Sequence, residues 1–343
     1  MAYLWGKTAV GSAMAVNFAI PLATVLKNRQ LWDEPMAVLA GNMSLVCTMN
    51  GLVVALIGVY DLVQLKLDVL CRSMQYVGFG FGIGIKAAHV CMAADQFVAV
   101  VHPLRHLPLM LRARPWLFAA TWLAVGAHVL FGMLAAAFEL ETFAERTARR
   151  QNGTALFPEC RWETSLANVY TVVFELEVAL LSLSTAAMLV HTGIIGHRTS
   201  RLLRARCHRQ PDTAAGERTR KFSDNYAAFK KILLVLLLTM TLDLVAPVVR
   251  LASRWHPMPR LNGFLHLLRV LAFIFEGWTY GLLNAKLRAA YRKTFCRNSA
   301  CCSRRVENDM EYGRQSPQLP NNGTEPSVSV ICPVHPYQAD ARE

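Results

Sequence analysis

The chain has 343 residues, of which 54% are hydrophobic and 17% are charged, with a formal net charge of +13. A soluble domain normally has about 25% charged residues, and here the hydrophobic residues are gathered in long blocks, as in membrane-spanning segments. We therefore attribute the positive charge to membrane topology and not to nucleic-acid binding. The first block begins beside Met1 without a basic segment before it, so we expect it to insert uncleaved.

Seven hydrophobic blocks follow one another along the chain. Each is long enough to cross a bilayer as a helix, and helices are expected because backbone groups in lipid must pair within the segment. Their length and lack of alternation exclude a porin-like barrel. The blocks are residues 2–26, 35–65, 70–101, 115–138, 169–195, 232–251 and 261–283.

Lysine and arginine are distributed unevenly between the loops. Far more of them lie in the first, third and fifth connections between the blocks and in the C-terminal segment than in the N-terminal segment and the other connections. The fifth connection includes the basic residues 197–231. Positive loops face the cytoplasm. The protein is therefore expected to be a multi-pass membrane protein, with its N-terminus outside and its C-terminus cytoplasmic.

Ionisable side chains lie inside several blocks, where charge is costly unless it faces a partner or a wet cavity. Lys86 and His89 are about one turn apart in the third block, which favours one interior face for both. The later blocks contain Glu175, Asp243, Arg250, His266, Arg269 and Glu276.

The loop before the fifth block contains the sequon Asn152-Gly153-Thr154 and Cys160. On the outer side, Asn152 is a predicted glycosylation site. Cys160 is the only cysteine in an outer loop, and Cys71 is the only other cysteine near that face. These two are the only candidates for a disulfide in an oxidising compartment.

The segment after the seventh block reads as a short amphipathic helix, residues 287–295, that can lie on the membrane surface. Cys296, Cys301 and Cys302 follow at once, which predicts palmitoylation, with metal binding by the three thiols as the alternative. Residues 303–343 are polar and contain several prolines, so we expect a disordered cytoplasmic tail after a domain of residues 1–302.

The end of the third block carries a recognisable pattern. It reads Asp95-Gln96-Phe97-Val98-Ala99-Val100-Val101-His102-Pro103-Leu104, with Cys71 about one helix length earlier. This resembles the third transmembrane helix of rhodopsin-like (class A) G-protein-coupled receptors, which usually have Asp-Arg-Tyr here. Partial matches to the family extend from Asn17 to Cys302. The resemblance implies an all-α membrane protein: a seven-transmembrane helix bundle with a short amphipathic eighth helix and a bridge between Cys71 and Cys160.

The resemblance also implies which residues couple ligand binding to the G protein. These switch residues are Asp95, Gln96, Phe97, Pro247 and Tyr280. Gln96 stands where the family has arginine, so the usual ionic latch cannot form. Glu276-Gly277 replaces the family's Asn-Pro before Tyr280.

A buried polar network is expected where the family binds sodium. Cys47 replaces the sodium-binding aspartate, and because a thiol is a poor ligand for a hard cation, no metal is expected. We expect Glu276 to pair with His89 or Lys86, with Asp243 competing for Lys86. The alternative is a neutral Glu276 satisfied by backbone and water.

The ligand is not expected to be a simple amine, because Gly78 stands where amine receptors carry an aspartate. The candidate ligand-facing residues are Arg250, His266, Arg269 and Glu175. The basic members could meet an acidic group, and the alternative is that they pair with Glu175 or Glu177.

The resemblance predicts a receptor of the plasma membrane that transmits an extracellular signal to heterotrimeric G proteins through atypical switches. The alternative is a receptor-like membrane protein that does not couple and acts by association with other receptors. The sequence shows no inverted repeat of the kind that transporters have. It also shows no group of side chains that indicates an enzyme or a cofactor. Expected partners are a G protein, membrane lipid and an unidentified ligand, with further receptor copies as an additional candidate; no nucleic acid is expected.

Overall fold

The fold is described from a computed structural model of the 343-residue chain. The described residues are 2–65, 67–102, 105–138, 140–142, 145, 160–207, 233–234, 236–253, 258, 261–262, 264–265, 268–269, 271–274 and 285–295. Nearly all of them are helical. Among them the β pairing is one isolated antiparallel bridge, between Thr142 and Ala167.

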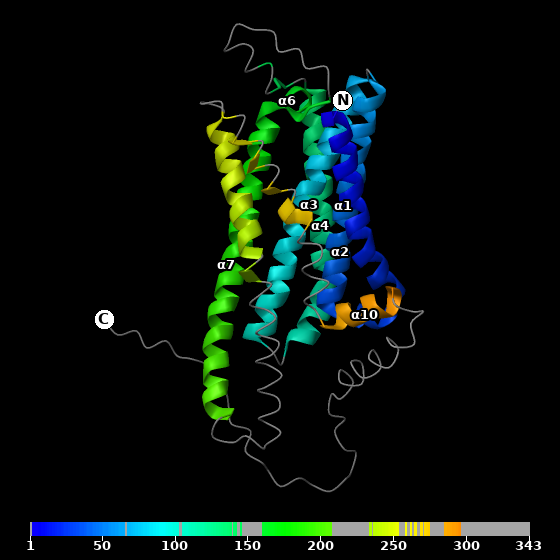
Figure 1. The fold of residues 1–343 in the computed structure, drawn as a ribbon. Coiled ribbons are helices and arrows are strands. Elements are labelled where there is room, and N and C mark those ends of the chain that lie inside the picture. The colour runs from blue at the N-terminus through cyan, green and yellow to red at the C-terminus, as the bar shows by residue number, and fades with distance from the viewer. Residues whose placement is uncertain are drawn as a thin grey trace, which may run out of the picture.

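Five helices in the described part of the chain are long and apolar enough to cross a membrane. They are α1 (Ala2–Lys27), α2 (Pro35–Val63), α3 (Asp68–Val101), α4 (His106–Ala137) and α7 (Asn168–Cys207). The short elements are η1 (Arg29–Asp33), α6 (Trp162–Ser165) and α10 (Ala285–Phe295). The long helices run along a common direction, and α10 lies across the end of the bundle beside α1 (Figure 1).

The helix boundaries follow local chemistry. Pro35 stands in the first turn of α2, where its missing N–H is not needed. α3 ends at Val101 because His102 precedes Pro103, and a residue before proline disfavours the α conformation. These boundaries agree with the predicted second and third blocks within two residues.

The predicted start of the fourth block, residue 115, is wrong. α4 begins at His106 and contains Pro115 inside the helix. The basic residues His106, Arg112 and Arg114 interrupt the hydrophobic pattern before residue 115, but they do not interrupt the helix. α7 is likewise longer than its hydrophobic block and ends at Cys207, as expected for a helix that extends into the following basic segment.

Glycines let neighbouring helices approach closely. A Cβ atom built on Gly51 of α2 would lie 2.6 Å from the backbone nitrogen of Ala15 in α1. In α3, a Cβ atom on Gly80 or Gly84 would lie 2.6 Å from Val129 or 2.4 Å from Val125 of α4. Gly80 and Gly84 therefore allow α3 and α4 to pack closely against each other.

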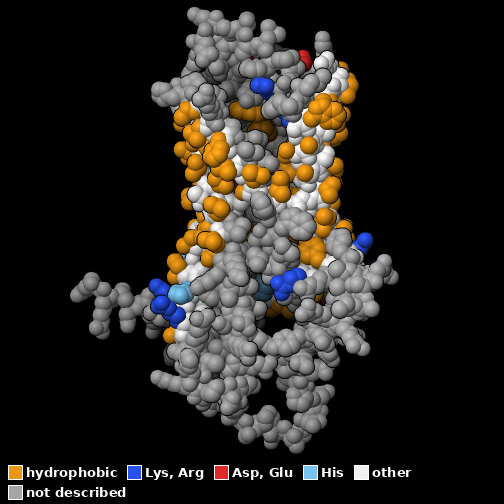
Figure 2. Space-filling model, viewed as in Figure 1, with side chains coloured by type: hydrophobic (Ala, Val, Ile, Leu, Met, Phe, Trp, Pro, Cys, Tyr) orange, Lys and Arg blue, Asp and Glu red, His pale blue; other side chains and the backbone are white. Residues whose placement is uncertain are grey.

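On the face shown in Figure 2, many hydrophobic side chains lie on the described surface of the bundle between its ends. Large side chains such as Leu123 and Leu180 are 71% and 63% exposed. Such exposure is costly in water and suits a lipid environment. The described helices thus have the length and the surface of a membrane protein.

Candidate functional site

A buried charge cluster joins three separate stretches of the chain. Lys86 of α3 forms an ion pair with Oδ2 of Asp243, which lies in the helical residues 236–252. Nε of Arg269, in the helical residues 268–269, donates to Oδ1 of Asp243 at 2.9 Å. The side chains of Lys86 and Asp243 are each 8% exposed. We call these three residues the central cluster.

The central cluster contains two residues of the predicted polar network. Lys86 pairs with Asp243, the predicted competitor. Glu276 lies outside the described residues, so its pairing with His89 or Lys86 stays a prediction. His89 is buried one turn along α3 and lies close enough to interact electrostatically with Asp243. Cys47 is fully buried in the hydrophobic core and packs among apolar side chains.

Burial gives this cluster a large energetic cost as well as a large attraction. Several kcal/mol per ion are needed to remove charge from water, about as much as the pairing returns, so such a pair is weak evidence of stabilisation. Removing one partner instead leaves an uncompensated charge and costs about 3–5 kcal/mol. The cluster therefore resists partial disruption and can be rearranged only by exchanging one partner for another.

A second ion pair lies two helical turns from the cluster. Nη1 of Arg250 donates to Oε1 of Glu175 in α7 at 2.6 Å. Arg250 follows Asp243 by seven positions, so the two side chains share one face of the helix, about 10 Å apart along its axis. For Arg250, pairing with Glu175 was the predicted alternative to a ligand-facing role. Arg269 pairs with Asp243, a partner that neither alternative named.

Sequence reasoning missed a contact between α4 and α7. Nε2 of His128 pairs with Oε2 of Glu177, and the side chain of His128 is 6% exposed. The rings of Tyr170 and Phe174 lie 5.6 Å and 6.2 Å from the His128 ring. The signal was present, because a histidine inside a hydrophobic block requires a partner, but the spacing does not say which carboxylate provides it.

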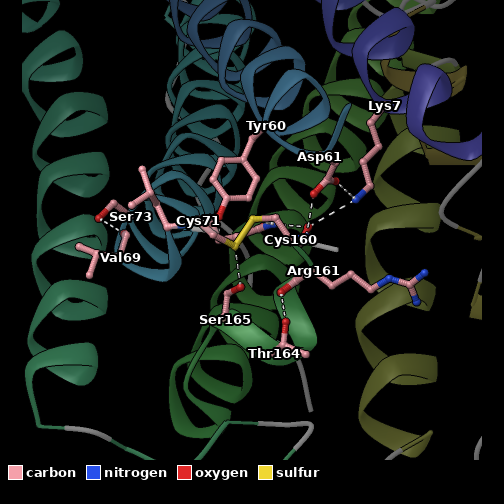
Figure 3. The surroundings of a disulfide bond; sticks show 12 residues. Lys7, Tyr60, Asp61, Val69, Cys71, Ser73, Cys160, Arg161, Thr164 and Ser165 are labelled. Atoms are coloured by element: carbon pink, nitrogen blue, oxygen red, sulfur yellow. Dashed lines mark hydrogen bonds and ion pairs between the residues drawn. A yellow bond between two sulfur atoms is a disulfide. The ribbon is translucent and has the colours of Figure 1, made fainter. Parts of the chain in front are cut away.

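The disulfide expected between Cys71 and Cys160 is present, with an S–S distance of 2.07 Å. Side chains from α1 and α2 hold the same loop (Figure 3). Asp61 accepts the backbone N–H of Cys160 at 2.7 Å and the ammonium of Lys7 at 2.7 Å. Gln75 of α3 donates to the Cys160 carbonyl at 3.3 Å. Three helices thus position Cys160 through polar contacts beside the covalent bond.

At the opposite end of α3, Asp95 bonds to the start of α4. Its Oδ1 lies 2.8 Å from Nε2 of His106, and Asp95 is 1% exposed. Gln96 donates to the sulfur of Met36 at 3.2 Å, and the Phe97 ring lies 5.6 Å from the ring of His191. Asp95 therefore has a partner outside the Asp95-Gln96-Phe97 motif, one that the sequence pattern did not indicate.

Polar contacts also link the remaining helices. Trp122 of α4 donates to Asn42 of α2 at 3.0 Å, and Asn17 of α1 donates to the carbonyl of Ile274 at 3.0 Å. Asn28, the residue after α1, donates a 3.2 Å hydrogen bond to Thr294 of α10. Burial raises the pKa of the Tyr291 phenol in α10 to about 12.

Some predicted site residues lie outside the described part of the chain. They are Asn152, His266, Glu276, Tyr280, Cys296, Cys301 and Cys302. Pro247 is described and is buried within the helical residues 236–252.

The comparisons with known proteins leave the family open. A scan against models of protein families finds no match, and a search of curated proteins finds none either.

Proposed function

We propose that the protein is a rhodopsin-like receptor of the plasma membrane, with seven transmembrane helices and an amphipathic eighth, that passes an extracellular signal to heterotrimeric G proteins. The observation that carries this proposal is the central cluster. It places three charged side chains from separate helical stretches in one buried contact. A bundle that only needed stability would do as well with hydrophobic side chains there.

In this proposal the cluster holds the resting arrangement of the helices. The helical residues 236–252 are fixed at Asp243 by Lys86 and Arg269, and two turns away at Arg250 by Glu175. A ligand that exchanges partners at the cluster releases this helix from α3. The movement reaches the opposite end of α3, where Asp95 and His106 hold α4. A two-state element of this kind is what receptor switching requires.

The alternative function is a receptor-like protein that does not couple. The observation that favours it is the chemistry around Asp95, which is engaged by His106 and is followed by Gln96 instead of the family's arginine. Activation of each G-protein subtype by the full-length protein in cells separates the two. Activation of any subtype above that of an empty membrane supports the first proposal. No activation of any subtype, with normal surface expression, supports the second.

A further inference from the structure

The central cluster contains hydrogen-bond donors that its single carboxylate does not use. Each oxygen of Asp243 is occupied by a different cation, Oδ2 by Lys86 and Oδ1 by Nε of Arg269. A guanidinium has five N–H donors and an ammonium has three. Among the described residues, Arg269 donates to Asp243, and Arg269 makes this contact through its Nε atom alone. The two Nη atoms of Arg269 keep the fork geometry that binds a carboxylate through two parallel hydrogen bonds.

The charges of the three described side chains do not balance. Two cations share one carboxylate, which leaves one net positive charge on the three described side chains. Net charge inside a membrane bundle is strongly disfavoured. Arg250 contributes nothing to this imbalance because Glu175 neutralises it. A second carboxylate beside Arg269 would balance the cluster.

Exposure identifies the member that a ligand can reach. The Arg269 side chain is 19% exposed, whereas those of Lys86 and Asp243 are each 8% exposed. Two turns further towards the disulfide end of the bundle, Oε2 of Glu175 is buried and has no hydrogen-bond partner within the described structure. The polar interior therefore continues from the cluster towards that end.

We propose that the central cluster is a binding site for a small carboxylic acid, whose carboxylate is held by the Nη atoms of Arg269 while Asp243 retains Lys86. The acid adds a negative charge beside Arg269 and competes with Asp243 for its guanidinium. This proposal deepens the proposed function by naming the class of the ligand, but binding itself does not require coupling to a G protein.

The test uses the purified full-length protein in lipid nanodiscs and follows thermal unfolding by tryptophan fluorescence. The probes are acetate, succinate and benzoate at constant ionic strength, and the controls are acetamide, succinamide and benzamide. At least one acid should raise the unfolding temperature saturably, and its amide should not. Arg269→Gln should abolish this shift. Arg114→Gln should retain it, because Arg114 donates to the Trp32 carbonyl on η1, away from the cluster.

A second variant keeps the test decisive if Arg269→Gln does not fold. Arg269→Lys retains the charge but loses the fork, so the concentration of acid at half-maximal shift should rise about tenfold. The proposal is overturned if no acid shifts the wild-type unfolding temperature, if the amides act equally, or if either Arg269 variant responds like the wild type. A saturable shift in a protein that activates no G protein removes the proposed function and leaves the site intact.

Discussion

Replacing Asp61 with alanine tests how the loop at Cys160 is held. The substitution removes the acceptor of two contacts, the 2.7 Å bond from Lys7 and the 2.7 Å bond from the Cys160 N–H. The Asp61 side chain is 1% exposed and that of Lys7 is 19% exposed. Loss of one partner of a buried ion pair costs about 3–5 kcal/mol, and the exposure of Lys7 places this pair at the low end. A buried N–H without an acceptor adds about 1–3 kcal/mol.

We therefore expect Asp61→Ala to lower the free energy of unfolding by about 4 kcal/mol. Asp61→Asn should cost less, because an amide oxygen can still accept the Cys160 N–H. Equilibrium unfolding of the full-length protein in detergent measures both. The matched control is a double-mutant cycle with Lys7→Met, in which we expect a coupling free energy of at least about 1 kcal/mol between the two side chains. Additive effects of the two substitutions would refute the reasoning.

Three further predictions concern packing, the disulfide and pH. Gly51→Ala should destabilise the α1–α2 contact, because its Cβ atom would lie 2.6 Å from the Ala15 nitrogen. The control Gly126→Ala, whose Cβ atom would have no atom within 4 Å, should raise the free energy of unfolding by up to about 1 kcal/mol in the same assay. Cys160→Ser should lower the free energy of unfolding by about 4 kcal/mol, because the disulfide closes a loop with a sequence separation of 89. A reducing agent should leave the unfolding midpoint of this variant unchanged. Because burial raises the pKa of Tyr291 to about 12 from 10.0, the stability that its neutral phenol contributes is complete below pH 10 and is lost as the pH rises through 12. Tyr291→Phe should remove this fall of the unfolding free energy with pH, and a variant that keeps the same fall contradicts the burial argument.

The sequence contains enough information to place the long helices along the chain. Hydrophobic length locates a span, and the pair Cys71 and Cys160 followed from the scarcity of cysteine on one face. The start of α4 at His106 was missed because hydropathy marks the membrane and not the helix end. The region around Pro115 remains helical although a proline there reads as a boundary.

The partners of charged side chains could not be deduced from the same pattern. Spacing fixes how far Lys86 lies along α3, but not which neighbouring helix faces it, so Asp243 and Glu276 were equal in principle. The same applies to Lys7 and Asp61, which approach each other across 54 positions of sequence. Helix rotation and packing decide such pairs, and both are tertiary properties that a single sequence does not display.

The central claim is that the cluster around Asp243 restrains a signalling bundle. Its most direct test is basal nucleotide exchange on purified heterotrimeric G proteins, catalysed by the full-length protein in lipid nanodiscs. Asp243→Asn should raise the exchange rate at least several-fold above wild type, because it removes the charge that holds Lys86 and Arg269. Thr241→Val, at an exposed position on the same helical stretch, should match the wild type. Equal exchange rates for Asp243→Asn, Thr241→Val and the wild type, with intact folding, would contradict the claim.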